Sequence, residues 1–252
     1  MAALKDSMNL LQKIRKNGAV TRELHWWDIA ILTVILFGGA VYTSTTSFFY
    51  SSAAHSFEKA LEFSANDNYR AFATQAVLLC VALLYLWLRR FDFSQWHMRI
   101  TFKAVLFGCA LFIAVSLAMD IFYITVAALL HNPLDLSATE ELANVFPTID
   151  VSLVLYSLLN GFYEELYFLG ICLAVPQEKL KFAFLFSLIV RFSFHTYQGI
   201  VSAVGIAVVV GIVFFVLYEK TSRKNLIPFF AAHALADVFG AGVLDYFFAR
   251  AL

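Results

Sequence analysis

Two adjacent carboxylates, Glu164 and Glu165, lie in the middle of a run that is otherwise as apolar as a membrane span. An ionised acid in hydrocarbon costs about 3 kcal/mol on insertion scales. Such a pair must therefore face a protein-lined cavity or be protonated. An ionisable residue within a membrane span is by default a candidate for a functional site, and its partners are expected on other spans.

Further ionisable residues in apolar runs supply these partners. Arg191 and His195 are four residues apart, and so are His233 and Asp237. Residues at this spacing share one face of a helix. Each pair is therefore expected to present both side chains to the same neighbour. Asp120 has no partner at a useful spacing, which favours a structural role for it.

The residue types indicate a hydrolytic chemistry. Glu164 and Glu165 are about 100° apart around a helix axis, so one can face a site while the other faces a neighbouring helix. A carboxylate and two imidazoles in a desolvated place either bind a metal or activate a water directly. A second histidine oriented by an aspartate can stabilise a developing oxyanion. The reaction class indicated is hydrolysis of an amide in a peptide that enters from the bilayer.

The composition indicates a polytopic membrane protein. Of the 252 residues, 61% are hydrophobic and only 14% are charged, whereas soluble proteins have roughly a quarter of charged residues. The net charge is zero, so no nucleic-acid partner is expected. The three cysteines lie within apolar runs and lack metal-ligand spacing, which is typical of small core residues.

The apolar runs predict an all-α bundle of about seven transmembrane helices, because a span needs about 20 apolar residues. Only Gln198 and Gly199 offer a turn between the fifth and sixth spans, so counts of six or eight stay open. A basic or amphipathic tail at 1–25 precedes a single transmembrane domain at 26–252. The predicted spans are 26–50, 71–88, 102–130, 149–175, 180–197, 200–218 and 226–248.

The distribution of basic residues predicts a cytoplasmic N-terminus. Fourteen of the 18 Lys and Arg residues fall in the tail and in the second, fourth and sixth connections. Lys and Arg favour the cytoplasmic side of short loops. The opposite side would carry only Lys59, Arg70 and Arg250. We expect an integral membrane protein, and the compact length suits a bacterial plasma membrane.

The depths of the two histidines do not agree with these boundaries. At the helical rise, His195 lies about 21 Å from the start of the 180–197 span, and His233 lies about 10 Å from the start of the 226–248 span. Both spans start on the same side of the membrane. Either the 180–197 span begins deeper or tilts, or the two histidines are arranged more loosely than the motif implies; we expect the boundary to be at fault.

Three motifs occur in a fixed order. The first motif contains the adjacent acids Glu164 and Glu165. The second, at 191–199, has a histidine near the end of an apolar helix. The third reads His-x-x-x-Asp from His233 to Asp237. Together they resemble the CPBP family (CAAX protease and bacteriocin-processing, or Abi) of intramembrane endopeptidases. The resemblance covers about 149–245.

The resemblance implies specific roles. Glu164 would be the general base for a water, with His195 assisting it, and His233 and Asp237 would polarise the carbonyl. The family is described both as metal-dependent and as glutamate-type without a metal. A divalent metal such as zinc, if used, would be held by Glu164, His195 and His233. The sequence has no His-Glu-x-x-His motif, which disfavours a zincin-type site.

The sequence departs from the family pattern at one position. The first motif of the family is Glu-Glu-x-x-x-Arg, and its arginine falls on Leu169. Glu165 therefore needs another counterion. We expect Arg191 to supply it from the next helix, so that Arg191 and Glu165 support the catalytic groups.

The sequence favours an intramembrane endopeptidase that acts on a membrane-associated or lipidated peptide. Retention of all four candidate catalytic positions supports this function. The missing arginine at Leu169 instead favours a non-catalytic relative that acts in bacteriocin immunity or regulates a partner. A proton- or ion-coupled transporter would also use buried acids, but no inverted repeat is evident in the sequence.

Overall fold

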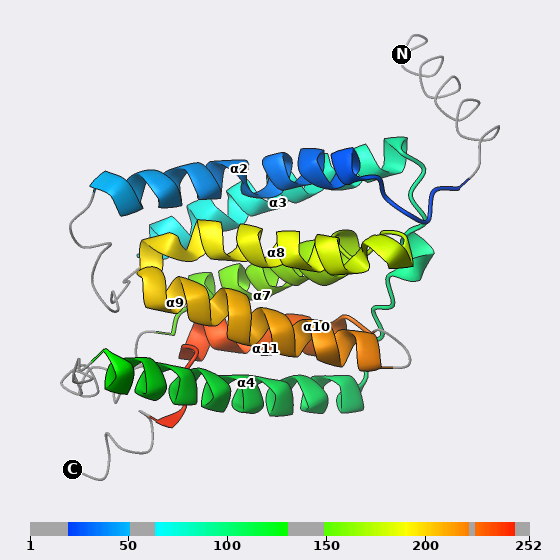
Figure 1. The fold of residues 1–252 in the computed structure, drawn as a ribbon. Coiled ribbons are helices and arrows are strands. Elements are labelled where there is room, and N and C mark those ends of the chain that lie inside the picture. Colours follow the sequence, from blue (N-terminus) through cyan, green and yellow to red (C-terminus); the bar gives the residue numbers. More distant parts are fainter. Residues whose placement is uncertain (1–19, 51–63, 131–148, 222–224, 245–252) are drawn as a thin grey trace.

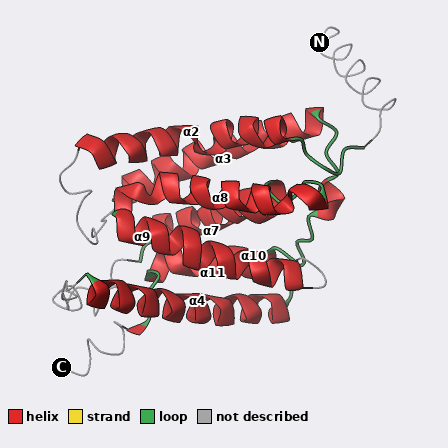
Figure 2. Cartoon of the chain, viewed as in Figure 1, coloured by secondary structure: helices red, strands yellow, loops and turns green. Residues whose placement is uncertain are grey.

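The computed structural model describes residues 20–50, 64–130, 149–221 and 225–244, and all regular elements in these ranges are helical (Figures 1 and 2). This confirms the predicted all-α class. The long helices lie roughly side by side and alternate in direction (Figure 1). They are α2 (Trp26–Tyr50), α3 (Ala65–Leu88), α4 (Phe102–Leu129), α7 (Val151–Glu165), α8 (Leu180–His195), α9 (Ile200–Val204) with α10 (Gly211–Lys220), and α11 (Ile227–Phe239).

Among the described residues, four helical segments are long and apolar enough to cross a membrane: 26–50, 65–88, 102–129 and 200–220. The three helices that carry the sequence motifs, α7, α8 and α11, are shorter than the predicted spans. The number of crossings and their orientation therefore stay predictions. The 1–19 part of the predicted tail and the 131–148 connection lie outside the described residues.

Local sequence explains where several helices begin and end. α3 begins at Ala65 rather than near 71, because Ser64 and Asp67 form a capping box at its first turn. α11 ends at Phe239, well before the predicted boundary at 248. Gly240 follows with a φ of 82°, which a glycine adopts without strain.

The structure bears on one predicted structural role and on one predicted boundary. Asp120 is buried, and its Oδ2 accepts hydrogen bonds of 3.0 Å from the backbone N–H groups of Val243 and Leu244. Its expected structural role is thus confirmed. α8 begins at Leu180, directly after the short helix η5 (Gln177–Lys179), where the fifth span was predicted to start, and its depth in the membrane stays a prediction.

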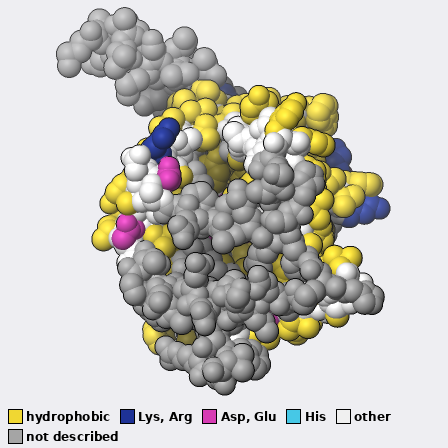
Figure 3. Space-filling model, turned by 90° about the vertical axis from the view of Figure 1, so that its left-hand side faces the viewer, with side chains coloured by type: hydrophobic (Ala, Val, Ile, Leu, Met, Phe, Trp, Pro, Cys, Tyr) yellow, Lys and Arg dark blue, Asp and Glu magenta, His cyan; other side chains and the backbone are white. Residues whose placement is uncertain are grey.

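α7 has a central position in the bundle. It packs against α3 and α11, while α11 also packs on α4 and α2 packs on α8. In Figure 1, α2 and α3 lie at the top, α8 and α7 beneath them, and α4 at the bottom. Viewed onto the end where α2 and α4 terminate, hydrophobic side chains cover much of the described rim (Figure 3). The acids of α7 are thus surrounded by other helices.

Two glycines allow α11 to approach its neighbours at backbone distance. A Cβ atom on Gly161 of α7 would lie 2.7 Å from the carbonyl oxygen of Phe230, and one on Gly108 of α4 would lie 2.9 Å from that of Pro228. Small residues at helix interfaces permit this close packing in membranes. They fix the depth and rotation of α11, which carries His233.

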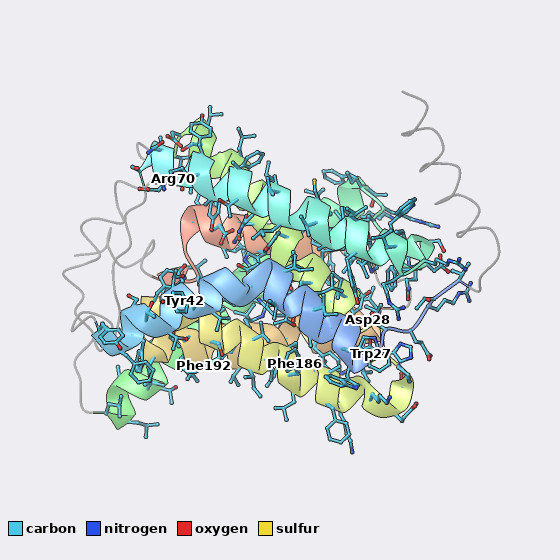
Figure 4. All side chains as sticks on the ribbon, turned by 90° about the horizontal axis from the view of Figure 1, so that it is seen from above. Trp27, Asp28, Tyr42, Arg70, Phe186 and Phe192 are labelled. Atoms are coloured by element: carbon cyan, nitrogen blue, oxygen red, sulfur yellow. The ribbon has the colours of Figure 1, made fainter. Side chains whose placement is uncertain are left out.

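The beginning of α2 is tied to the end of α3 by a buried acid. Asp28 has no exposed side-chain surface and accepts hydrogen bonds from Arg89 Nε (2.7 Å) and from the Tyr85 hydroxyl (2.6 Å). Trp27 and Asp28 lie at one end of the bundle, and Arg70 lies at the other (Figure 4). The contact holds α2 and α3 in register at that end.

Candidate active site

The two acids lie at a change of helix type. α7 ends at Glu165 and continues as a π-helical turn, η4 (Leu166–Ile171), in which the Cys172 N–H bonds to the Tyr167 carbonyl at 2.8 Å. Single π-helical turns inside helices are frequent at functional sites. The wider turn changes the direction of the side chains that follow Glu165, including Leu169.

Glu165 forms a buried ion pair with Arg191 of α8. Arg191 Nη2 lies 2.9 Å from both Oε1 and Oε2 of Glu165, and the exposed side-chain fractions are 2% and 0%. The ring of Phe168 lies 4.0 Å from the guanidinium carbon. The predicted contact between α7 and α8 is confirmed, and it neutralises one of the two adjacent acids.

His233 of α11 lies between three carboxylates. Its Nδ1 is 2.7 Å from Glu165 Oε1, and its Nε2 is 3.7 Å from both Glu164 Oε2 and Asp237 Oδ1. Since a carboxylate paired with arginine only accepts hydrogen bonds, Nδ1 carries a proton. Nε2 therefore faces Glu164 and Asp237. The structure brings Glu164, Glu165, His233 and Asp237 together, as the motifs predict.

Glu164 is buried but unsatisfied. It is 4% exposed, and its Oε2 has no hydrogen-bond partner among the described residues. A buried polar atom without a partner costs about 1–3 kcal/mol, so such atoms are usually satisfied by water or ligand. A reactive water would naturally bind to this oxygen, beside His233 Nε2.

His195 is held differently. Its Nδ1 lies 2.7 Å from the carbonyl oxygen of Arg191. Because a carbonyl oxygen only accepts hydrogen bonds, Nδ1 carries the proton, and Nε2 is the free acceptor of the neutral ring. His195 is not in the cluster of donor atoms within 4.8 Å of one another, which among the described residues comprises Glu164, Glu165 and His233. The depth mismatch in the sequence therefore reflects a looser arrangement of the two histidines.

A helix outside the motifs supports the residues after His195. The Ser44 hydroxyl of α2 lies 3.0 Å from Thr196 Oγ1 and accepts a hydrogen bond of 2.9 Å from the Tyr197 N–H. Ser44 and Thr196 are both buried. These bonds fix the short helix η6 (Thr196–Gln198) and, through it, the end of α8.

A comparison with protein families shows which family the segment with the three motifs matches. Residues 147–239 match the family described as type II CAAX prenyl endopeptidase Rce1-like. This segment is an Rce1-like domain. It contains α7, α8, α9, α10 and α11, and therefore all three sequence motifs. No curated protein and no solved structure matches the chain.

The side chains of the Rce1-like domain do not fit the metal set that the resemblance implies. His195 lies outside the cluster of Glu164, Glu165 and His233. Within that cluster, both oxygens of Glu165 already accept Arg191, and one of them also bonds to His233. A carboxylate neutralised by a guanidinium is a poor ligand for a further cation. The donor set fits direct activation of a water by Glu164 better.

Two site residues were not predicted. Asn160 Nδ2 donates to Asp237 Oδ2 at 2.9 Å, and Gln75 Nε2 donates to Asn160 Oδ1 at 2.6 Å. Asn160 lies four residues before Glu164 on α7, so helical spacing offered a signal for it. Gln75 lies on α3, outside the Rce1-like domain, and only its polarity within an apolar helix distinguishes it.

Two tyrosines were also missed. Tyr156 and Tyr197 lie close enough to interact electrostatically with Glu164 and Asp237. A chain with 17% aromatic residues gives no sequence signal that separates these two from the others. They add neutral hydroxyl groups to the surroundings of the carboxylates.

Proposed function

We propose that this protein is an intramembrane endopeptidase that hydrolyses a peptide bond in a membrane-associated or lipidated peptide. The observation that carries the proposal is the unsatisfied Oε2 of the buried Glu164, 3.7 Å from His233 Nε2, within an Rce1-like domain. A buried base beside a hydrogen-bond donor is what hydrolysis of an amide requires.

Glu164 is the general base in this proposal. Its carboxylate takes a proton from a water, and the resulting hydroxide attacks the carbonyl carbon of the peptide bond. The protonated Glu164 then gives that proton to the amide nitrogen as the carbon–nitrogen bond breaks. His195 assists with its free Nε2, which can accept a hydrogen bond from the same water.

His233 and Asp237 stabilise the tetrahedral intermediate. Glu165 holds His233 through Nδ1, so that Nε2 is directed toward the side of Glu164 and Asp237. In the imidazolium form, Nε2–H donates to the oxyanion, and Asp237 favours that form. A donor fixed before the reaction stabilises developing charge without reorganisation. The ion pair of Glu165 with Arg191 supports this arrangement.

Two further features belong to the proposal. Seven membrane crossings with a cytoplasmic N-terminus place the basic connections inside the cell, and a bacterial plasma membrane is the expected location.

The Glu165–Arg191 contact also weighs against a non-catalytic relative, because the ion pair is retained even though Leu169 replaces the arginine of the motif.

The test is cleavage of a prenylated CAAX peptide by the purified protein in detergent or liposomes. Mass spectrometry of the products would locate the cut bond. An endopeptidase releases a C-terminal fragment of more than one residue with a new amino group, and one oxygen from labelled water enters the new carboxyl group of the N-terminal fragment. If intact peptide alone is recovered from prenylated peptides and from unprenylated membrane peptides, the proposal is wrong.

A further inference from the structure

A chain of two amide side chains links α3 to the site. Gln75 of α3 donates from Nε2 to Asn160 Oδ1 at 2.6 Å, and Asn160 of α7 donates from Nδ2 to Asp237 Oδ2 at 2.9 Å. Asn160 is 4% exposed. The chain thus crosses three helices and ends on a carboxylate that faces His233.

The direction of this chain is set by chemistry. An ionised carboxylate only accepts, so Asn160 must present its NH₂ group to Asp237 and its oxygen to Gln75. Gln75 must then present its own NH₂ group to Asn160. Its remaining oxygen is buried and has no partner among the described residues, so this orientation leaves one buried acceptor unsatisfied.

The chain determines which oxygen of Asp237 is available. Oδ2 is occupied by Asn160, whereas Oδ1 lies 3.7 Å from His233 Nε2. Asp237 is more exposed than the other acids of the site, with 21% of its side-chain surface accessible. A side chain with this freedom needs a fixed bond to keep one oxygen directed at His233.

We propose that Gln75 and Asn160 are positioning residues for Asp237, so that α3, which precedes the Rce1-like domain, is part of the catalytic support. The catalytic part of this inference rests on the proposed function. Neither residue is placed against the substrate. Both act through Asp237 and His233 on the stabilisation of the oxyanion.

The experiment reverses the direction of the chain. Gln75→Glu keeps the shape of the side chain but replaces the donor by an acceptor, so Asn160 must rotate and present its oxygen to Asp237. We expect kcat for the prenylated CAAX peptide to fall about tenfold, as loss of about 1.4 kcal/mol implies, with KM unchanged. The thermal unfolding midpoint should also fall.

The second substitution restores the reversed chain. In Gln75→Glu combined with Asp237→Asn, residue 237 donates to the Asn160 oxygen and Asn160 donates to residue 75. The unfolding midpoint of the double variant should exceed that of Gln75→Glu alone, whereas its kcat stays low because Asp237→Asn removes the carboxylate that favours the imidazolium form of His233. Gln75→Met is the matched control, because it removes the donor without reversing the chain and should gain nothing from Asp237→Asn.

Wild-type kcat and midpoint in Gln75→Glu, or purely additive losses of the unfolding midpoint in the double variant, would overturn the inference. The midpoints separate this failure from that of the proposed function. If the wild-type protein cleaves no peptide, the proposed function fails, while recovery of the midpoint in the double variant still supports the chain and its absence still refutes it.

Discussion

The guanidinium of Arg191 lies 2.9 Å from both carboxylate oxygens of Glu165 and thereby joins α8 to the end of α7. Leu169, where the family motif has its arginine, lines the same small cavity as Arg191. The structure therefore keeps the buried pair with its cation on a different helix. Arg191 lies four residues before His195 on α8, and Glu165 bonds to His233, so the ion pair is connected to both histidines.

Removal of this cation should destabilise the protein. Arg191→Leu leaves Glu165 buried without its cation, and breaking a buried pair costs about 3–5 kcal/mol. We expect a large fall in the unfolding midpoint and loss of activity. Adding Leu169→Arg to Arg191→Leu should recover part of both, because residue 169 faces the same cavity. A double variant no better than Arg191→Leu would show that residue 169 cannot reach Glu165.

Packing of α7 on α11 should tolerate no added methyl group. In Gly161→Ala the new Cβ would meet the Phe230 carbonyl oxygen at 2.7 Å and the Ala234 nitrogen at 2.9 Å. Backbone atoms cannot rotate away, so α11 must shift and displace His233. We expect lower stability and at least tenfold lower kcat, measured by thermal unfolding and peptide cleavage.

Gly39→Ala is the control for that substitution. Gly39 lies within α2, and a Cβ there has nothing within 4 Å. Alanine is favoured over glycine inside a helix by about 1 kcal/mol, so this variant should be as stable as the wild type or slightly more stable. Equal behaviour of the two variants would contradict the packing argument.

Ser44 should stabilise the segment after His195. In Ser44→Ala, the buried Thr196 hydroxyl and the Tyr197 N–H lose a partner, which costs about 1–3 kcal/mol. The control is Thr43→Ala on the same helix, since within the described part of the chain the exposed Thr43 bonds to carbonyls of its own helix alone. Hydrogen exchange should increase at Tyr197 in Ser44→Ala and not in Thr43→Ala.

The sequence was informative where a charge lies in an apolar run. Burial of Glu165 without the motif arginine was enough to predict its partner, since Arg191 is a cation within the neighbouring span. The four-residue spacing likewise placed His233 and Asp237 on one face of α11. These inferences depend on helix geometry and on the cost of an unpaired charge, and the choice of Glu165 as the partner of Arg191 depends also on the family motif.

Other features depend on how the helices pack, which an apolar sequence hardly encodes. The π-helical turn after Glu165 and the approach of α11 to Gly161 arise from contacts between helices. Gln75 lies far from the motifs along the chain, so its bond to Asn160 was not predictable. His195 was placed with the other catalytic groups on the basis of its motif, although its depth along α8 already argued for a looser arrangement.

The central claim is that the carboxylate of Glu164 activates the attacking water without a bound metal. The most direct measurement compares cleavage of a prenylated CAAX peptide by wild-type protein and Glu164→Gln, each with and without a chelator. We predict full wild-type activity in the chelator and no cleavage by Glu164→Gln, whose unfolding midpoint should stay near that of the wild type because Oε2 has no hydrogen bond to lose among the described residues. Cleavage by Glu164→Gln at the wild-type rate, or loss of wild-type activity in the chelator with recovery on adding metal, would contradict it.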